Sequence, residues 1–362
     1  MKESTSIPEQ KNILFLISYI GGGGAERVAC RLVSEFSKRH KVYLMYFDEK
    51  EKEYPVDKKV NLIPFTNPYK QNNQSNNLKK IPQKVLRIKE IEKIRRIYKI
   101  DITISFLYWP NIYNITAGGG SIKISSERND PEGKGEDYFS NMILAYQKSD
   151  KVVFQTKYVM NKFPESIRKK SIIIPNPISV SCLSDASYTE KKIVSVGRLV
   201  PQKNHALLIK AFSNFKRSHN GYHLYIYGIG PLLDNLKLLS QTFNLEDYIH
   251  FEGFAENIHE KIKNAEQFIL SSDFEGMPNA LMEAMMMGLS CISTNCSGVG
   301  EIIDDEINGL LVPIGDVSVL SRKMCLLSDD KNLQKKLRSG AIIKSEEWKT
   351  ESISKKWESL FL

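Results

Sequence analysis

The sequence predicts an α/β protein made of two doubly wound domains, each with a parallel sheet. Short apolar runs alternate with stretches of helical periodicity, which is the pattern of repeated β-α-β units. The alternation occurs twice, and Pro175-Asn176-Pro177 with a Ser-rich stretch separates the two series. The length of 362 residues also exceeds what one hydrophobic core usually holds.

The first series opens with an apolar strand at residues 12–19, followed by four glycines and a helix at residues 25–39 with one apolar face. Further strands in this half are expected at residues 42–47, 60–65, 102–107, 122–125 and 152–155. Strands of the second series are expected at residues 193–196, 223–227, 249–253, 267–271, 290–294 and 309–312.

These series predict an N-terminal domain at residues 1–177 and a C-terminal domain at residues 190–340. A final helix at residues 341–362 is expected to pack back on the N-terminal domain. Two doubly wound sheets leave a cleft at the carboxyl ends of their strands, where ligands bind in such folds.

Charge is distributed unevenly along the chain. The net charge is +9, but residues 1–180 carry a balance of +12 and the remainder a balance of −3. The N-terminal half is therefore attracted to anions such as nucleic acid, anionic lipid or a phosphorylated substrate.

The cysteines and apolar runs limit the class of protein. Five cysteines without a C-x-x-C pair argue against a disulfide framework or a zinc site and fit a reducing cytosol. The N-terminus has no apolar signal core, and the run at residues 13–20 is too short to span a bilayer. We expect a cytoplasmic protein, either soluble or bound at a membrane surface.

Four consecutive glycines, Gly21 to Gly24, lie between the first strand and the first helix. Glycines there let the backbone approach a ligand, and the amides at the start of a helix attract anions. The loop matches neither G-x-G-x-x-G nor a P-loop, and a tight turn is the alternative interpretation.

Two cations follow the first strand of the second domain, in Gly197-Arg198-Leu199 and at Lys203. Arg as a bidentate fork and Lys as a point charge suit a diphosphate. Solvated surface cations are the alternative.

The segment at residues 272–284 carries two carboxylates, Glu275 in a loop and Glu283 in the helix that follows. Because Glu275 precedes the helix, the two do not stack on one helix face. Glu283 is flanked by methionines, which we interpret as core packing, and a carboxylate among them needs a partner such as a ligand hydroxyl.

Taken together, these motifs resemble the family 4 retaining glycosyltransferases, which have the GT-B fold of two Rossmann-like domains facing across a cleft. The resemblance rests on the order and spacing of the glycine-rich loop, G-R-L-x-x-x-K, the Glu275 to Glu283 region and Asn308-Gly309-Leu310-Leu311-Val312-Pro313.

The resemblance implies a role for each matching position. Arg198 and Lys203 would hold the donor diphosphate, Glu275 would contact the transferred sugar, and Glu283 would bind the nucleotide ribose. Phe254 falls where relatives hold the base. The other donor-binding positions that it implies are Gly22, Gly23, Gly24, Gly197, Gly276, Met277, Pro278, Asn279, Ala280 and Leu281.

Glu127 and Arg128 follow a strand of the first domain and are expected to bind acceptor or phosphate. Many relatives have a histidine where this chain has Arg128, so a histidine-dependent role finds no support here. A surface cation is the alternative interpretation.

Residues 78–99 predict a basic amphipathic helix with a stripe of Val85, Ile88, Ile91, Ile94 and Ile97. Such a helix suits an anionic membrane surface. Packing of the stripe on the sheet is the other possibility, and both can hold.

The function predicted from these features is metal-independent, retaining transfer of a hexose or N-acetylhexosamine from a UDP-sugar. The expected acceptor is a growing glycan on a polyprenyl diphosphate, and the enzyme is expected at the inner face of the cell membrane. No Asp-x-Asp motif is evident, and no cofactor is expected beyond the donor substrate. A UDP-sugar epimerase or hydrolase of the same fold is the alternative. Nucleic-acid binding is not expected, because basic and aromatic residues are not interleaved.

Overall fold

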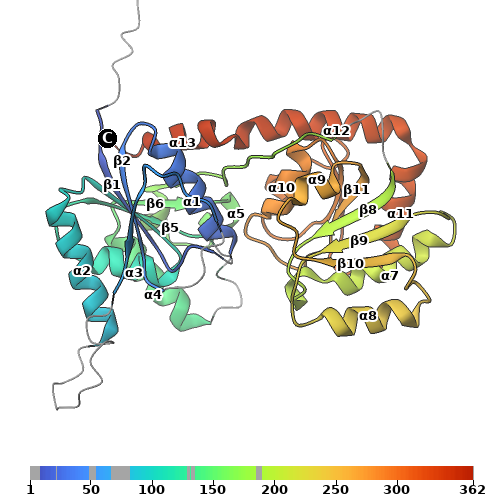
Figure 1. The fold of residues 1–362 in the computed structure, drawn as a ribbon, viewed down its shortest axis with the longest axis horizontal. Helices are drawn as coiled ribbons and strands as arrows, with labels where there is room; N and C mark the ends of the chain where they lie inside the picture. Colours follow the sequence, from blue (N-terminus) through green and yellow to red (C-terminus); the bar gives the residue numbers. More distant parts are fainter. Residues whose placement is uncertain are drawn as a thin grey trace, which may run out of the picture. The chain divides into compact units, whose positions relative to one another are not determined.

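A computed structural model describes residues 9–21, 23–48, 54–66, 82–128, 131, 135–184 and 190–361. The chain forms two compact units. The first comprises residues 1–177 and 350–362, and the second comprises residues 178–349. Each unit is an α/β layer structure with helices on both faces of a parallel sheet (Figure 1).

The first unit has a seven-stranded parallel sheet in the order β3-β2-β1-β4-β5-β6-β7. Its strands are β1 (Asn12–Ile17), β2 (Lys41–Tyr46), β3 (Asn61–Pro64), β4 (Ile102–Phe106), β5 (Ile122–Ser126), β6 (Lys151–Phe154) and β7 (Ser171–Ile173). Its helices are α1 (Gly24–Phe36), α2 (Gln83–Ile97), α3 (Tyr108–Thr116), α4 (Glu136–Lys148), α5 (Lys157–Asn161), α6 (Glu165–Arg168) and α13 (Thr350–Glu358). The short strand β7 was not predicted.

Alternation along β1 explains why both faces of this sheet are covered. Phe15 faces a core that includes α1 and α13, whereas its neighbours Leu14 and Leu16 face α2 and α3. Successive side chains of a strand point to opposite faces, so a fully apolar strand needs helices on both sides.

The second unit has a six-stranded parallel sheet in the order β10-β9-β8-β11-β12-β13. Its strands are β8 (Glu190–Val196), β9 (His223–Tyr227), β10 (Ile249–Gly253), β11 (Ala265–Leu270), β12 (Ser290–Thr294) and β13 (Leu310–Val312). Its α-helices are α7 (His205–Lys216), α8 (Leu233–Thr242), α9 (Ile258–Ile262), α10 (Asn279–Met286), α11 (Val317–Asp329) and α12 (Lys331–Ser345). Three short 3-10 helices are η1 (Pro201–Lys203), η2 (Val299–Glu301) and η3 (Glu346–Trp348).

Both sheets reverse their strand order beside their first strand, between β1 and β4 in one unit and between β8 and β11 in the other. At such a switch point the loops after the two neighbouring strands diverge to opposite faces and leave room for a ligand. The loops after β8 and β11 are those that contain the cations and the loop carboxylate singled out in the sequence.

The C-terminal segment differs from the single helix expected at residues 341–362. Residue 341 lies inside α12, which ends at Ser345 in the second unit, and only α13 and the residues after it belong to the first. Helix α13 lies beside α1 (Figure 1). Its Ile353 and Trp357 are fully buried in the core that α1 also lines.

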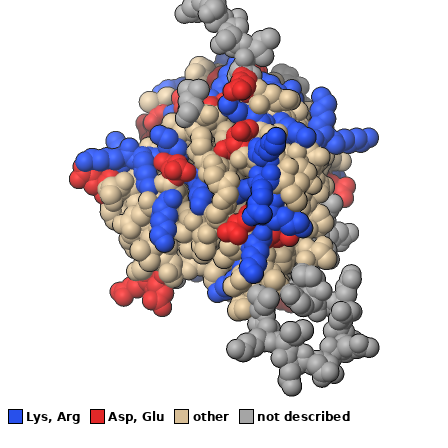
Figure 2. All heavy atoms as spheres, turned by 90° about the vertical axis from the view of Figure 1, so that its left-hand side faces the viewer, with Lys and Arg blue, Asp and Glu red and all other residues tan. Residues whose placement is uncertain are grey.

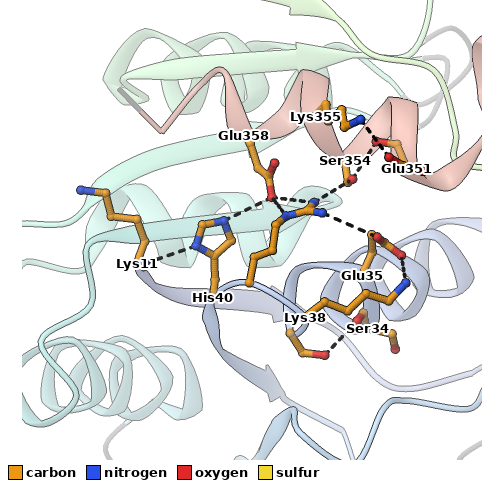
Figure 3. A network of polar contacts seen from close by, with 11 residues as sticks. Lys11, Ser34, Glu35, Lys38, His40, Glu351, Ser354, Lys355 and Glu358 are labelled. Atoms are coloured by element: carbon orange, nitrogen blue, oxygen red, sulfur yellow. Dashed lines mark hydrogen bonds and ion pairs between the residues drawn. The ribbon is translucent and has the colours of Figure 1, made fainter. Parts of the chain in front are cut away.

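Polar contacts add to this docking. Glu358 accepts hydrogen bonds from Arg39 at 2.9 Å and lies 3.2 Å from Nε2 of His40, which points at it in Figure 3. Arg39 also donates to Ser354. Burial alone would raise the pKa of Glu358, but the hydrogen bonds from His40 and Arg39 outweigh it and lower that pKa.

Candidate active site

The loop after β8 brings Arg198 and Lys203 to the carboxyl edge of the second sheet. Asn204 adopts a left-handed conformation, with φ 42°, and its side chain accepts a hydrogen bond from the amide of Leu207 to cap α7. The 3-10 turn before this cap points Lys203 back toward the sheet edge, whereas Arg198 remains exposed. Within the described residues the guanidinium of Arg198 has no hydrogen bond or ion pair, although its backbone carbonyl accepts one from the amide of Val200 at 2.9 Å.

The loop after β11 supplies Glu275, and Lys203 binds it. Nζ of Lys203 lies 2.5 Å from Oε1 of Glu275, which also accepts a 2.6 Å hydrogen bond from Ser272. The side chains are 16% and 7% exposed, so this ion pair is largely withdrawn from solvent. Two residues that are 72 positions apart thus form one charged centre at the switch point.

The backbones of the two loops are joined as well. The amide of Asp273 donates to the carbonyl of Gln202 at 2.9 Å, and the Asn204 amide group donates to the Asp273 carboxylate at 2.8 Å. Ser271 donates to the carbonyl of Lys203 at 3.0 Å. These contacts fix the position of the ion pair before any ligand binds, which favours a preorganised site.

The loop after β12 lies against the loop after β11 at Gly298. This glycine has φ 81°, and a Cβ there would overlap the carbonyl oxygen of Gly276. Ser297, its neighbour, donates to the carbonyl of Glu275 at 2.9 Å. Only glycine permits this approach, so the loop after β12 buttresses the loop that carries Glu275.

Helix α10 starts directly after this loop and carries Glu283. Pro278 precedes the helix and provides no side-chain cap, so the start of α10 can accept an anion. Glu283 is 4% exposed. The neighbouring methionines lie in the core of the unit, as the sequence predicted: Met282, Met285, Met286 and Met287.

His259 is a residue of this site that the sequence analysis did not select. Its Nε2 lies 3.4 Å from Oε2 of Glu283, and both side chains are largely buried. It comes from α9, 24 residues before Glu283 in the sequence, and no spacing rule links the two. Only the folding of α9 against α10 reveals the contact.

Phe254 directly follows β10 and is 72% exposed. The carbonyl of Gly253 accepts a 2.7 Å hydrogen bond from the amide of Gly228, so the loops after β9 and β10 run side by side. An exposed aromatic ring at the carboxyl edge of a parallel sheet is suited to stacking on a planar ligand.

Comparison with known proteins agrees with this geometry. Residues 184–343 match the family model described as "Glycosyl transferases group 1". The chain is 28% identical over 351 residues to a Campylobacter jejuni enzyme, covering 92% of this chain and 94% of that one. That enzyme is named N-acetylgalactosamine-N,N'-diacetylbacillosaminyl-diphospho-undecaprenol 4-alpha-N-acetylgalactosaminyltransferase.

Solved structures show the same fold over almost the whole chain. TarM superposes with a TM-score of 0.83 at 15% identity and covers 98% of this chain and 99% of its own. HepE from Anabaena, in complex with UDP, has a TM-score of 0.80 at 15% identity, covering 96% and 99%. The chain has the GT-B fold, and residues 184–343 match a glycosyltransferase family.

The glycine-rich loop of this glycosyltransferase starts α1 in the first unit. Gly22 lies outside the described residues, whereas Gly23 is the extended residue before α1 and Gly24 is its first residue. The buried carboxylate of Glu26 lies so close to Gly23 that a side chain there would collide with it. The start of α1 therefore already faces an anionic group, and its contact with a donor diphosphate stays a prediction.

Glu127 and Arg128 lie buried in the first unit of the glycosyltransferase instead of projecting from it. Glu127 accepts hydrogen bonds from the amide of Arg128 and, at 2.7 Å, from Tyr146. Arg128 donates to Asn176 at 3.0 Å and lies 4.5 Å from the ring centre of Phe106. This corrects the surface-cation alternative, because Arg128 is only 6% exposed.

Burial has two consequences for Arg128. It lowers the pKa of the guanidinium to about 9, which still leaves the group charged at neutral pH. It also leaves Nε and one terminal nitrogen without a hydrogen-bond partner in the described part of the chain. The residue thus retains unused donors, although it is not open to solvent.

The basic helix is α2, at Gln83–Ile97, and residues 78–81 of the predicted segment lie outside the described residues. Packing on the sheet is confirmed for part of the apolar stripe, and its contact with a membrane stays a prediction. Ile91 and Ile94 pack in the core, whereas Val85 and Ile97 are exposed. Figure 2 shows a ridge of basic side chains on the face that carries α2. The exposed cations of this helix are Lys84, Lys89, Lys93 and Arg96.

Arg95 does not belong to that basic surface, although the predicted helix included it. It is 1% exposed and donates to the carbonyls of Asn114, Ala117 and Gly118, at 3.1, 2.6 and 2.8 Å. These carbonyls are at the end of α3, where the backbone lacks helical partners and favours a cation. Arg95 is therefore a structural residue.

Two kinds of feature are absent from the part of the chain that the structure describes. No helix in them is long and apolar enough to cross a bilayer. Nor do three or more His, Cys, Asp or Glu side chains come together there in a way that could hold a metal ion.

Proposed function

We propose that this enzyme transfers a hexose or N-acetylhexosamine from a UDP-sugar to a growing glycan on a polyprenyl diphosphate, with retention of configuration and without a metal ion. The observation that carries the donor half of this proposal is the Lys203–Glu275 ion pair at the switch point, beside the start of α10. A cation, a carboxylate and backbone amides lie close together there, and this combination supports binding of a sugar diphosphate.

In this proposal Lys203 remains between two anions. Its ammonium group is bound to Glu275 without a ligand, and it would bridge that carboxylate and the donor diphosphate when the donor is present. The guanidinium of Arg198, which has no partner among the described residues, would supply the second positive charge. Together they would stabilise the nucleotide diphosphate as it leaves, the role that a divalent ion has in other enzymes.

The chemical step would form a bond between an acceptor oxygen and the anomeric carbon while the bond from that carbon to the phosphate oxygen breaks. Glu275, held by Lys203 and Ser272, would bind hydroxyls of the transferred sugar and is not aimed as a nucleophile. We therefore propose attack from the face that the diphosphate leaves, which retains configuration.

The acceptor half of the proposal rests on two features. The enzyme from Campylobacter jejuni, which has similar length, is named as acting on a diphospho-undecaprenol substrate. The exposed cations of α2 would hold the first unit at an anionic membrane, each contributing about 1 kcal/mol. We therefore place the enzyme at the inner face of the cell membrane. Arg128 keeps unused donors for an acceptor phosphate, whereas Glu127 is already engaged inside the unit.

A donor screen tests this function. The purified enzyme is given a set of UDP-sugars with a polyprenyl-diphosphate-linked glycan, and products are read by mass spectrometry and anomeric NMR coupling. We expect one added sugar with an α linkage, formed equally well in excess EDTA. Release of free sugar without an acceptor product would favour a hydrolase or epimerase, and activity restored only by Mg²⁺ or Mn²⁺ would refute metal independence.

A further inference from the structure

The two carboxylate oxygens of Glu275 have different surroundings. Oε1 accepts hydrogen bonds from Nζ of Lys203 at 2.5 Å and from the hydroxyl of Ser272 at 2.6 Å. Oε2 accepts no hydrogen bond within the described residues, and unlike the orphaned atoms buried in this structure it is not closed off from solvent. The 7% exposure of the side chain therefore includes Oε2. Because an ionised carboxylate oxygen has about two acceptor positions, those of Oε1 are used and those of Oε2 are available.

The hydroxyl group of Ser272 comes from a fixed position. Ser272 is fully buried, and its carbonyl accepts a hydrogen bond from the hydroxyl of Thr294 at 2.5 Å. The residues on either side of it donate hydrogen bonds to backbone carbonyls of the loop after β8. An ionised carboxylate can only accept, so the hydroxyl proton of Ser272 points at Oε1 of Glu275. The donor that Glu275 receives from Ser272 therefore has a fixed direction.

We propose that Ser272 is a positioning residue that holds Oε1 of Glu275 and thereby presents Oε2 to the hydroxyls of the transferred sugar. This inference rests on the proposed function, in which Glu275 contacts that sugar. Lys203 alone does not fix the carboxylate, because an ammonium on a flexible stem is a point charge that either oxygen can meet. A second donor of fixed direction on the same oxygen prevents that exchange. The orientation exists before the donor binds, so the ligand does not have to order the carboxylate itself.

A purely structural role for Ser272 is the competing explanation. In that case its hydroxyl only satisfies a buried carboxylate, and the loop after β11 becomes less stable without it. Thr294→Val tests this explanation, because it removes a buried hydroxyl that supports the same loop through the carbonyl of Ser272 and does not touch the carboxylate. Loop support predicts the same consequence for Thr294→Val and Ser272→Ala, whereas positioning predicts a loss of sugar binding in Ser272→Ala alone.

The experiment measures by calorimetry the affinity of the wild type and the variants for UDP and for UDP-sugars. The UDP-sugar probes are UDP-glucose, UDP-galactose and their N-acetylated counterparts, and the readout is the affinity for the best-bound UDP-sugar divided by the affinity for UDP. We expect Ser272→Ala to lower this ratio about three- to tenfold, the size of ordering one side chain on binding, and to keep UDP within about twofold of the wild type. Thr294→Val should keep the wild-type ratio. A variant that folds poorly weakens UDP and UDP-sugar alike, so the ratio remains informative.

Glu275→Ala in the same assay separates the inference from the function on which it rests. If Glu275→Ala lowers the ratio but Ser272→Ala keeps it, positioning by Ser272 is refuted and the sugar contact of Glu275 stands. If Thr294→Val lowers the ratio as much as Ser272→Ala, Ser272 acts through the loop, and positioning is refuted as well. If Glu275→Ala keeps the full ratio, or if the wild type binds none of these UDP-sugars, the proposed function fails and the inference fails with it.

Discussion

Replacing Arg95 with glutamine should destabilise the first unit strongly, whereas the same change at the neighbouring Arg96 should be almost silent. Arg95 is buried and binds three backbone carbonyls, the side chain of Asn114 and, at 3.1 Å, Thr103. Arg96 is exposed on the next position of the same helix. The two substitutions have the same chemistry and helix propensity, so the difference between them isolates burial.

The structure sets the size of the effect. Glutamine can donate a hydrogen bond to one of the carbonyls at the end of α3. At least two other carbonyls then lose their hydrogen-bond donor, and each loss destabilises the unit by about 1–3 kcal/mol. The cost should therefore be about 3 kcal/mol or more for Arg95→Gln, against less than about 0.5 kcal/mol for an exposed position such as Arg96. If the free energy of unfolding decreases by about 2–3 kcal/mol per molar urea, the urea concentration at the midpoint of unfolding falls by roughly 1–1.5 M.

Urea unfolding followed by tryptophan fluorescence and circular dichroism measures both variants against the wild type. Trp109 and Trp357 both belong to the first unit, so the fluorescence reports mainly on the part of the enzyme that contains Arg95. Equal midpoints for the Arg95 and Arg96 variants would refute the structural role of Arg95 and return it to the basic surface of α2.

Three further outcomes follow from the same contacts. Lys203→Ala should lower turnover by roughly 10²-fold and weaken donor binding less, because the charge of Lys203 matters most as the diphosphate leaves. Steady-state kinetics measure this effect, and wild-type turnover in a folded variant would contradict it. Exposed cations of α2 should act together in liposome flotation, so that the triple glutamine variant of Lys89, Lys93 and Arg96 binds anionic vesicles weakly yet keeps wild-type turnover on a soluble acceptor. The lowered pKa of Glu358 means that its stabilisation is present above the ordinary carboxyl value of 4.5 and lost as the pH falls below it. Thermal unfolding across this range should therefore be less pH-dependent in Glu358→Gln, and an unchanged slope would show that the contacts of Glu358 with Arg39 and His40 contribute little.

The local pattern of residues was enough to predict much of this fold. Apolar runs bounded by glycine and helical stretches predicted the parallel strands of both sheets, because strand and helix periodicities reflect which faces are buried. The loop residues Lys203 and Glu275 could each be placed at the end of a strand. The short strand β7, with three half-buried residues, carries too little pattern to be predicted.

Other properties depend on which elements become neighbours. Lys203 contacts Glu275 because β8 pairs with β11, although α7, β9, α8, β10 and α9 lie between them in the chain, and long-range packing decides this pairing. His259 contacts Glu283 only in the folded unit, where α9 and α10 are neighbours. No local spacing of residues in the sequence predicts this contact. Arg95 and Arg96 are chemically identical, yet one is buried and the other exposed, because the helical period turns Arg95 toward the sheet beside Ile91 and Ile94. Local sequence thus determined the helices and strands and the residues available at their ends. Tertiary packing decided which of those residues share a site, because the energy of a contact between two distant segments depends on both segments and cannot be read from either one alone.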